Sequence, residues 1–128
     1  MSASEEILAR YRRIERETDS FGRSIGVKKL KPSEQRKLKI LTPGLDGSTE
    51  VRSDDGKVSH IPDRFEMMVV ASVREIEGNP VTFPKSEGEL DAVYNALDRE
   101  GLTAAITAYV RLYDDETAGG GTVEDAKN

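Results

Sequence analysis

The chain has 128 residues, of which 36% are hydrophobic and 34% are charged, with a net charge of −5 and no cysteine. This length supports one modest hydrophobic core, and the lack of cysteine excludes disulfides and zinc sites built from thiolates. We expect no signal peptide and no membrane span, because the longest apolar run, residues 67–71, is far short of the roughly 20 residues that a bilayer requires, and we therefore expect a cytoplasmic protein.

The N-terminal residues show a short apolar stripe at helical spacing. The stripe consists of Ile7, Leu8, Tyr11 and Ile14. It predicts a helix over residues 4–16 with Ser4 as its cap. Because four apolar residues make a weak stripe, we expect residues 1–17 to form a helical arm that docks on the body, docks on a partner or frays.

The next segment changes from helical to alternating period. Residues 20–23 have turn chemistry, and residues 24–28 alternate apolar with polar or small side chains, as a half-buried strand does. We predict a small hairpin that pairs residues 18–19 with 24–30. Pro32 and Ser33 then open a short helix that ends near Leu41.

Residues 42–60 are rich in turn residues, including Pro43-Gly44 and Asp46-Gly47. They predict a long exposed loop, with a fragile hairpin around Val51 and Val58. A loop of this length in a compact domain is mobile or functional.

The strongest helical pattern starts at Pro62. An inward face recurs at helical spacing through Phe65, Met68, Val69, Ser72, Val73 and Ile76. Met67, Val70 and Ala71 make the flanks apolar too, so the helix is central to the core or covered by a partner. The turn at residues 77–80 and the extended residues 81–84 predict that its end unwinds into a second hairpin.

Two further helices complete the predicted domain. Ser86 and Glu89 form a capping-box pattern at the start of the first helix, and Gly101 stands where a left-handed residue would end it. The second helix would run to Tyr113. We predict an α+β, mainly helical domain over residues 18–113, with two hairpins packed on about four helices, and a disordered acidic and glycine-rich tail over residues 114–128.

The charge is unevenly distributed along the chain. Residues 10–39 contain 11 basic and 4 acidic residues, a local charge of +7. This segment is a candidate nucleic-acid face, although it lacks interleaved aromatic residues, and a solvated surface is the more common explanation of such a charge run. The net negative charge of the chain also argues against a nucleic-acid partner.

The sequence offers no recognisable catalytic apparatus. His60, the one histidine, stands in the turn-rich segment without a matching nucleophile motif. Phosphate-loop, dinucleotide-binding and zinc-protease motifs do not occur, and Asp54-Asp55-Gly56 lacks the spacing of a calcium loop. We expect a protein that is not an enzyme, with no catalytic residue, no cofactor and no metal site.

Four short sequence segments, which together extend over about 90 residues, are informative in their order along the chain. They are DSFGRSIGVKKL at 19–30, ASVREIEGNPVTFP at 71–84, ELDAV at 89–93 and GLTAA at 101–105. In this order and spacing they resemble the tail assembly chaperones of long-tailed bacteriophages and related prophages.

The resemblance implies a specific non-catalytic function. Members of that family coat the long, aggregation-prone tape measure protein in the host cytoplasm, help to recruit tail tube subunits around it, and are absent from the mature virion. Many are made in two lengths by a ribosomal frameshift. The resemblance thus implies the tape measure and tail tube proteins as partners. A structural tail-completion protein of the same gene cluster remains an alternative.

A chaperone of this kind needs an apolar groove for a client helix, lined by adaptable methionine and aromatic side chains. Our candidates for this groove are Met67, Val70, Tyr94, Tyr109 and Tyr113, with Met68 as a weaker one. For each of them, simple burial in the core is the competing interpretation. The apolar surplus on the later helices is also compatible with self-association.

Overall fold

The computed structural model describes residues 2–44, 47–52 and 55–127; the side chains of Thr49, Val51, Ile61 and residues 115–127 lie outside this description. In chain order the elements are α1 (Ala3–Arg12), β1 (Ile14–Thr18), β2 (Ser24–Lys28), α2 (Pro32–Leu41), β3 (Ser48–Arg52), β4 (Val58–Pro62), α3 (Asp63–Ser72), β5 (Val73–Ile76), β6 (Asn79–Pro80) and α4 (Glu87–Lys127). The predicted class, α+β and mainly helical, is confirmed.

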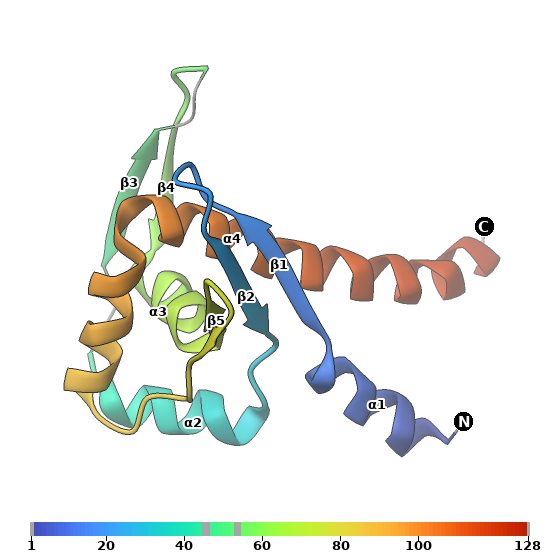
Figure 1. Cartoon of the computed structure of the whole chain (residues 1–128). Coiled ribbons are helices and arrows are strands. Elements are labelled where there is room, and N and C mark those ends of the chain that lie inside the picture. The colour runs from blue at the N-terminus through green and yellow to red at the C-terminus, as the bar shows by residue number, and fades with distance from the viewer. Residues whose placement is uncertain (1, 45–46, 53–54, 128) are drawn as a thin grey trace.

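The two predicted hairpins merge into one four-stranded antiparallel sheet with the strand order β1-β2-β5-β6. The junction is the β2–β5 pair, in which Ile25 lies opposite Ile76 and Val27 opposite Val73. The sheet lies across α3 and the second half of α4, while α2 and the first half of α4 enclose α3 from other sides (Figure 1).

The core fills the space between the sheet and these helices. Its fully buried side chains come from β2, the segment after β2, α3, β5 and both halves of α4, and the largest are Tyr109, Ile25, Leu30, Leu90, Leu97, Val27, Val69, Val70 and Val73. Each large apolar side chain that is removed from water contributes about 1.5–3 kcal/mol. These residues therefore define one hydrophobic core.

The predicted N-terminal helix is too long at its C-terminal end. The helix begins at Ala3, and its N-cap is Ser2, which forms a capping box with Glu5, rather than the predicted Ser4; it ends before Arg13, which is extended. Residues 14–18 form β1 and pair with β2 over their whole length. The helical spacing of apolar residues over 4–16 therefore gave a wrong prediction for residues 14–16. The edge of β2 needs a hydrogen-bonding partner, and this tertiary requirement outweighs local helix propensity.

The α3 helix is shorter than its sequence pattern predicts. It ends at Ser72, and Val73 already belongs to β5. Val73 is buried in the strand. The longer predicted helix would have buried it too, because helical and strand periodicity both place this residue on the inward face. The second hairpin is confirmed, with Glu77 and Gly78 at positive φ in its turn.

The turn-rich segment contains the predicted hairpin. β3 and β4 pair as a separate two-stranded sheet that rises above the body (Figure 1). Of its turn residues, Ser53 and Asp54 lie outside the described part of the chain, as does Asp46 of the preceding turn.

The break in α4 lies at a different residue from the one predicted. Gly101 is helical and buried, and the break is at Asp98, with φ 56° and ψ −164°. The Asp98 carboxylate accepts a hydrogen bond of 2.8 Å from the amide of Arg99, the residue that follows the break. The backbone of α4 is helical to Lys127. The predicted disorder of residues 114–128 falls almost wholly on side chains outside the described part, and it stays a prediction.

Candidate functional site

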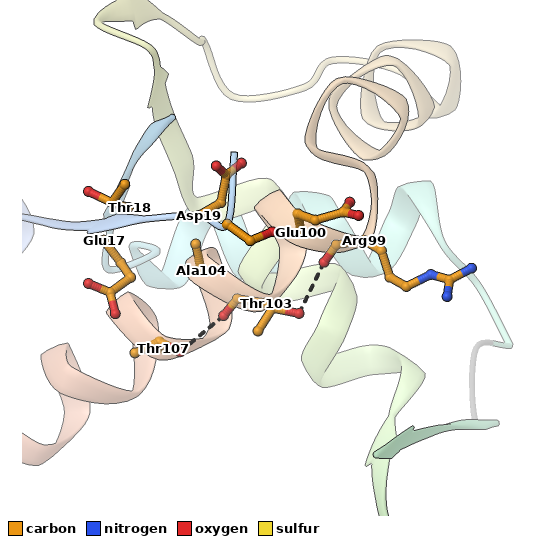
Figure 2. Close-up of a pocket in the computed structure, with 9 residues that line it drawn as sticks. Glu17, Thr18, Asp19, Arg99, Glu100, Thr103, Ala104 and Thr107 are labelled. Atoms are coloured by element: carbon orange, nitrogen blue, oxygen red, sulfur yellow. Dashed lines mark hydrogen bonds between the residues drawn. The ribbon is translucent and has the colours of Figure 1, made fainter. Parts of the chain in front are cut away.

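A polar cleft of about 260 Å³ lies between the end of β1 and the second half of α4 (Figure 2). The hydroxyls of Thr103 and Thr107 each donate 3.0 Å hydrogen bonds to helix carbonyls of α4. The carboxylate of Glu17 accepts a 3.0 Å hydrogen bond from Arg111. These three side chains are therefore engaged in contacts within the fold.

The Asp19 carboxylate, at the edge of this cleft, organises the turn between β1 and β2. Its Oδ1 accepts 2.9 Å hydrogen bonds from the amides of Phe21 and Arg23, and its Oδ2 accepts a 2.6 Å bond from the Arg23 side chain. Burial alone would raise the pKa of Asp19, but the hydrogen bonds and the positive charge of Arg23 outweigh it and hold the pKa below 3.8. Asp19 is therefore a structural carboxylate, ionised at neutral pH.

Arg23 connects this turn to the first half of α4. Its guanidinium donates to the carbonyls of Ala96 (2.7 Å) and Leu97 (2.6 Å), which are among the carbonyls that a helix end leaves without a partner. Gly101 allows the close approach, because a Cβ there would stand 3.0 Å from the guanidinium and 3.1 Å from Leu97. We call these five residues, Asp19, Arg23, Ala96, Leu97 and Gly101, the Arg23 network.

A second arginine holds together the opposite side of the domain. Arg74 donates to the carbonyls of Ala71 (2.7 Å) and Val73 (2.9 Å), pairs with Glu34 of α2 at 3.2 Å, and lies 5.7 Å from the centre of the Phe83 ring. Burial lowers the pKa of Arg74, against the opposing effect of Glu34. Arg74 thus fixes α2 and the segment after β6 relative to the end of α3.

An open apolar groove lies next to Arg74, between α2 and residues 82–85. We call it the α2 groove; its volume is about 590 Å³ and it is lined by Glu34, Lys37, Ile40, Leu41, Thr82, Phe83, Pro84 and Lys85. Ile40 is 72% exposed, while Leu41 and Phe83 are half-buried. Lys37 and Lys85 stand at its rim, and its one acid, Glu34, is paired with Arg74. The groove is therefore apolar inside and positively charged at its edge.

The predicted partner-binding residues do not form one surface. Val70 and Tyr109 are 1% and 0% exposed, so these two are core residues and the prediction of a surface role for them is wrong. Tyr109 fits between Phe65 and Tyr113 in edge-to-face contacts with centroid distances of 5.8 and 5.3 Å.

The remaining predicted residues are partly accessible, and the fold brings Met67, Met68 and Tyr94 together but leaves Tyr113 apart from them. The Tyr94 hydroxyl donates to Met67 Sδ at 3.9 Å, both side chains are half-buried, and burial raises the pKa of Tyr94. Met68 is also half-buried. Tyr113 is 39% exposed and lies 5.0 Å from Lys29 Nζ.

Sequence reasoning missed the residues of the α2 groove. The sequence predicted a short helix from Pro32 to about Leu41, and it did not single out Ile40 on that helix. A large apolar side chain on the outer face of a short helix was the available signal. Its partner Phe83 belongs to a segment that only the fold brings alongside α2.

The N-terminal arm, α1 (Ala3–Arg12), extends from the body on the far side of the molecule from the first half of α4 (Figure 1). None of its ten residues, all of them described, is buried. Ile7 and Leu8 are 48% and 50% exposed.

The basic segment 10–39 is spread over α1, β1, β2 and α2. Three of its arginines, Arg13, Arg16 and Arg23, form ion pairs with Glu15, Glu75 and Asp19 at 2.6–2.8 Å. These three of its eleven basic residues are therefore engaged by acids of the same chain.

Metal-ligand clusters and membrane-crossing helices do not occur in the part of the chain that the structure describes. His60 is exposed on β4, and no cluster of three or more histidine or carboxylate side chains is placed to hold a metal ion there. Among the same residues, no helix combines the length and apolar character that crossing a bilayer requires.

Comparison of the chain with protein-family models, with curated proteins and with solved structures finds no match.

Proposed function

We propose that this chain is a non-catalytic phage tail assembly chaperone, which binds the tape measure protein in the host cytoplasm and helps to recruit tail tube subunits. The proposal begins from the order and spacing of the sequence motifs between residues 19 and 105. It agrees with the structure in one respect that matters for binding: the molecule has an apolar groove that its own core does not fill.

The α2 groove is the observation that carries the proposal. An amphipathic helix binds such a groove through a few apolar anchors at helical spacing. Anchors packed against Ile40, Leu41 and Phe83 would each contribute about 1.5–3 kcal/mol of burial. Because association also costs translational and rotational freedom, a few such anchors suit a client that must later be released.

The second sequence motif connects the resemblance to this groove. Residues 71–84 supply the end of α3, the β5–β6 hairpin and, at their end, the groove residues Phe83 and Pro84. Arg74 of the same motif holds α2 in place through Glu34. A segment that resembles the chaperone family thus forms one wall of the groove.

The nucleic-acid alternative has weaker support, because arginines of the basic segment are paired within the fold. A tail-completion protein would differ from a chaperone in being present in purified particles.

The test is co-expression with fragments of a phage tape measure protein. We expect the intact chain to co-purify with at least one fragment and to increase its yield in the supernatant. Ile40→Asp should abolish both effects. Phe21→Asp is the matched control, since Phe21 is 76% exposed but lies in the β1–β2 turn. The proposal fails if no fragment co-purifies, and the groove assignment fails if the two variants behave alike.

A further inference from the structure

The N-terminal arm has the features of a docking element. Ile7 and Leu8 are adjacent and half-exposed, and Glu5 and Glu6 precede them in the first turn. A helix of ten residues is about 15 Å long, and in isolation it is marginally stable in water. Packing of its apolar stripe against another surface would supply the missing stability.

The α2 groove complements this arm in both polarity and charge. The groove offers Ile40, Leu41 and Phe83 to the two aliphatic side chains of the arm. Lys37 and Lys85, which line the groove, complement the two glutamates in the first turn of the arm, while its two basic residues lie in the last turn, away from this contact in sequence. Glu34 does not oppose this attraction, because Arg74 neutralises it.

The arm and the groove of one chain lie at opposite edges of the sheet. The arm joins β1, one edge strand, through the single residue Arg13, whereas residues 82–85 of the groove follow β6, the other edge strand. Three strand spacings separate these edges, roughly 14 Å. In the structure the arm points away from the body (Figure 1). A second copy can offer its groove without this constraint.

We propose that the N-terminal arm of one copy binds the α2 groove of a second copy. Each copy carries one arm and one groove, so reciprocal exchange closes a two-fold dimer, while head-to-tail exchange gives longer chains. The contact covers two apolar surfaces that are otherwise exposed on the same molecule. It does not require the proposed function, and where both hold, a client helix competes with the arm for the groove.

The first test is the mass of the intact chain by sedimentation or light scattering over a range of concentrations. We expect dimers or larger species that dissociate to the 14.1 kDa monomer on dilution. The double variant Ile7→Asp/Leu8→Asp and the variant Ile40→Asp should each remain monomeric at least tenfold above the concentration at which the parent chain associates. Ala9→Asp, on the opposite face of α1, and Phe21→Asp should associate as the parent does. Circular dichroism checks that each variant is folded.

A charge exchange tests the orientation of the contact. Glu5→Gln/Glu6→Lys keeps a side chain able to form the capping box, and it should weaken self-association. Lys37→Glu/Lys85→Glu should weaken it as well. A mixture of the two variants should form a heterodimer, because the altered arm of one then faces the altered groove of the other, while the unaltered arm and the unaltered groove form the original contact.

A monomeric parent chain at all concentrations would overturn the proposal. So would association that persists in both the arm variant and Ile40→Asp, or that is lost only when residues 114–128 are removed, which would make the acidic tail the occupant. This outcome can be distinguished from a failure of the proposed function, because the arm variant still has a free groove that can bind a tape measure fragment.

Discussion

The Arg23 network and the α2 groove both lie at the edge of the core, yet they use their residues in opposite ways. In the network, the hydrogen-bonding groups of Asp19 and Arg23 are satisfied by other groups of the same chain. In the groove, a large apolar side chain, Ile40, is left 72% exposed. The Arg23 network stabilises the fold, whereas the α2 groove presents apolar surface that the fold leaves exposed.

Residues of a distinctive sequence motif can therefore stabilise the fold, while the surface proposed to bind a partner lies elsewhere. The aspartate and arginine of residues 19–30 and the glycine of residues 101–105 meet in a single structural contact. Such residues are distinctive because few side chains meet these geometric demands. A docking surface needs only apolar character and shape, so its residues are less distinctive in sequence.

Arg23→Ala should have the largest effect on stability. It removes the ion pair of the buried Asp19 carboxylate and leaves the carbonyls of Ala96 and Leu97 without their donor. We expect the Tm to fall by about 10 °C or more, the range for loss of a buried ionic network. Thermal unfolding followed by circular dichroism measures this, and a fall of only one or two degrees would show that the network is dispensable.

Gly101→Val should have the next largest effect. Its new side chain meets the Arg23 guanidinium and Leu97 at contact distances that leave no room for further atoms. We expect a loss of about 2 kcal/mol in the free energy of unfolding, from overpacking. Gly88→Ala is the control, because only Ser86 Oγ, at 3.8 Å, is near its added methyl group. That variant should gain up to about 1 kcal/mol in denaturant unfolding.

Asp19→Asn should reveal the pH dependence of the network. The folded pKa of Asp19 is lowered, so its stabilising effect is present above its ordinary pKa of 3.8 and is lost as the pH falls through the folded value. The Tm of the variant should therefore be lower than that of the parent at pH 7, and the difference should shrink on acidification. A difference that is constant from neutral to acid pH would assign the effect to packing rather than to charge.

Ile40→Asp should have the smallest effect on stability although it alters the proposed binding surface. Because Ile40 is mostly exposed, its replacement should change the free energy of unfolding by less than about 1 kcal/mol. Denaturant titration measures this. A loss comparable to that of Gly101→Val would mean that Ile40 belongs to the core and that the groove is not a binding surface.

Local chemistry predicted much of the fold. The turn chemistry of residues 20–23 indicated the first turn, and Ser86 and Glu89 indicated the start of α4, where the Glu89 amide donates to Ser86 Oγ at 3.2 Å. These signals succeed because turns and caps depend on a few neighbouring residues.

Tertiary requirements explain what the sequence could not predict. β1 forms because β2 offers it an edge, and Gly101 is required by the approach of Arg23 rather than by the end of a helix. The candidate groove was misplaced for the same reason. Tyrosine and methionine patterns on α3 and α4 could not show that Tyr109 is enclosed by the core while Ile40 and Phe83 meet at the surface.

The most direct test of the account is a photocrosslink from the groove in intact cells. A photoreactive phenylalanine analogue would replace Ile40, with the same analogue at Phe21 as the control, during co-expression with the tape measure protein. The account predicts a crosslink from position 40 to the tape measure protein and none from position 21. Equal crosslinking from both positions, or none from position 40, would contradict it.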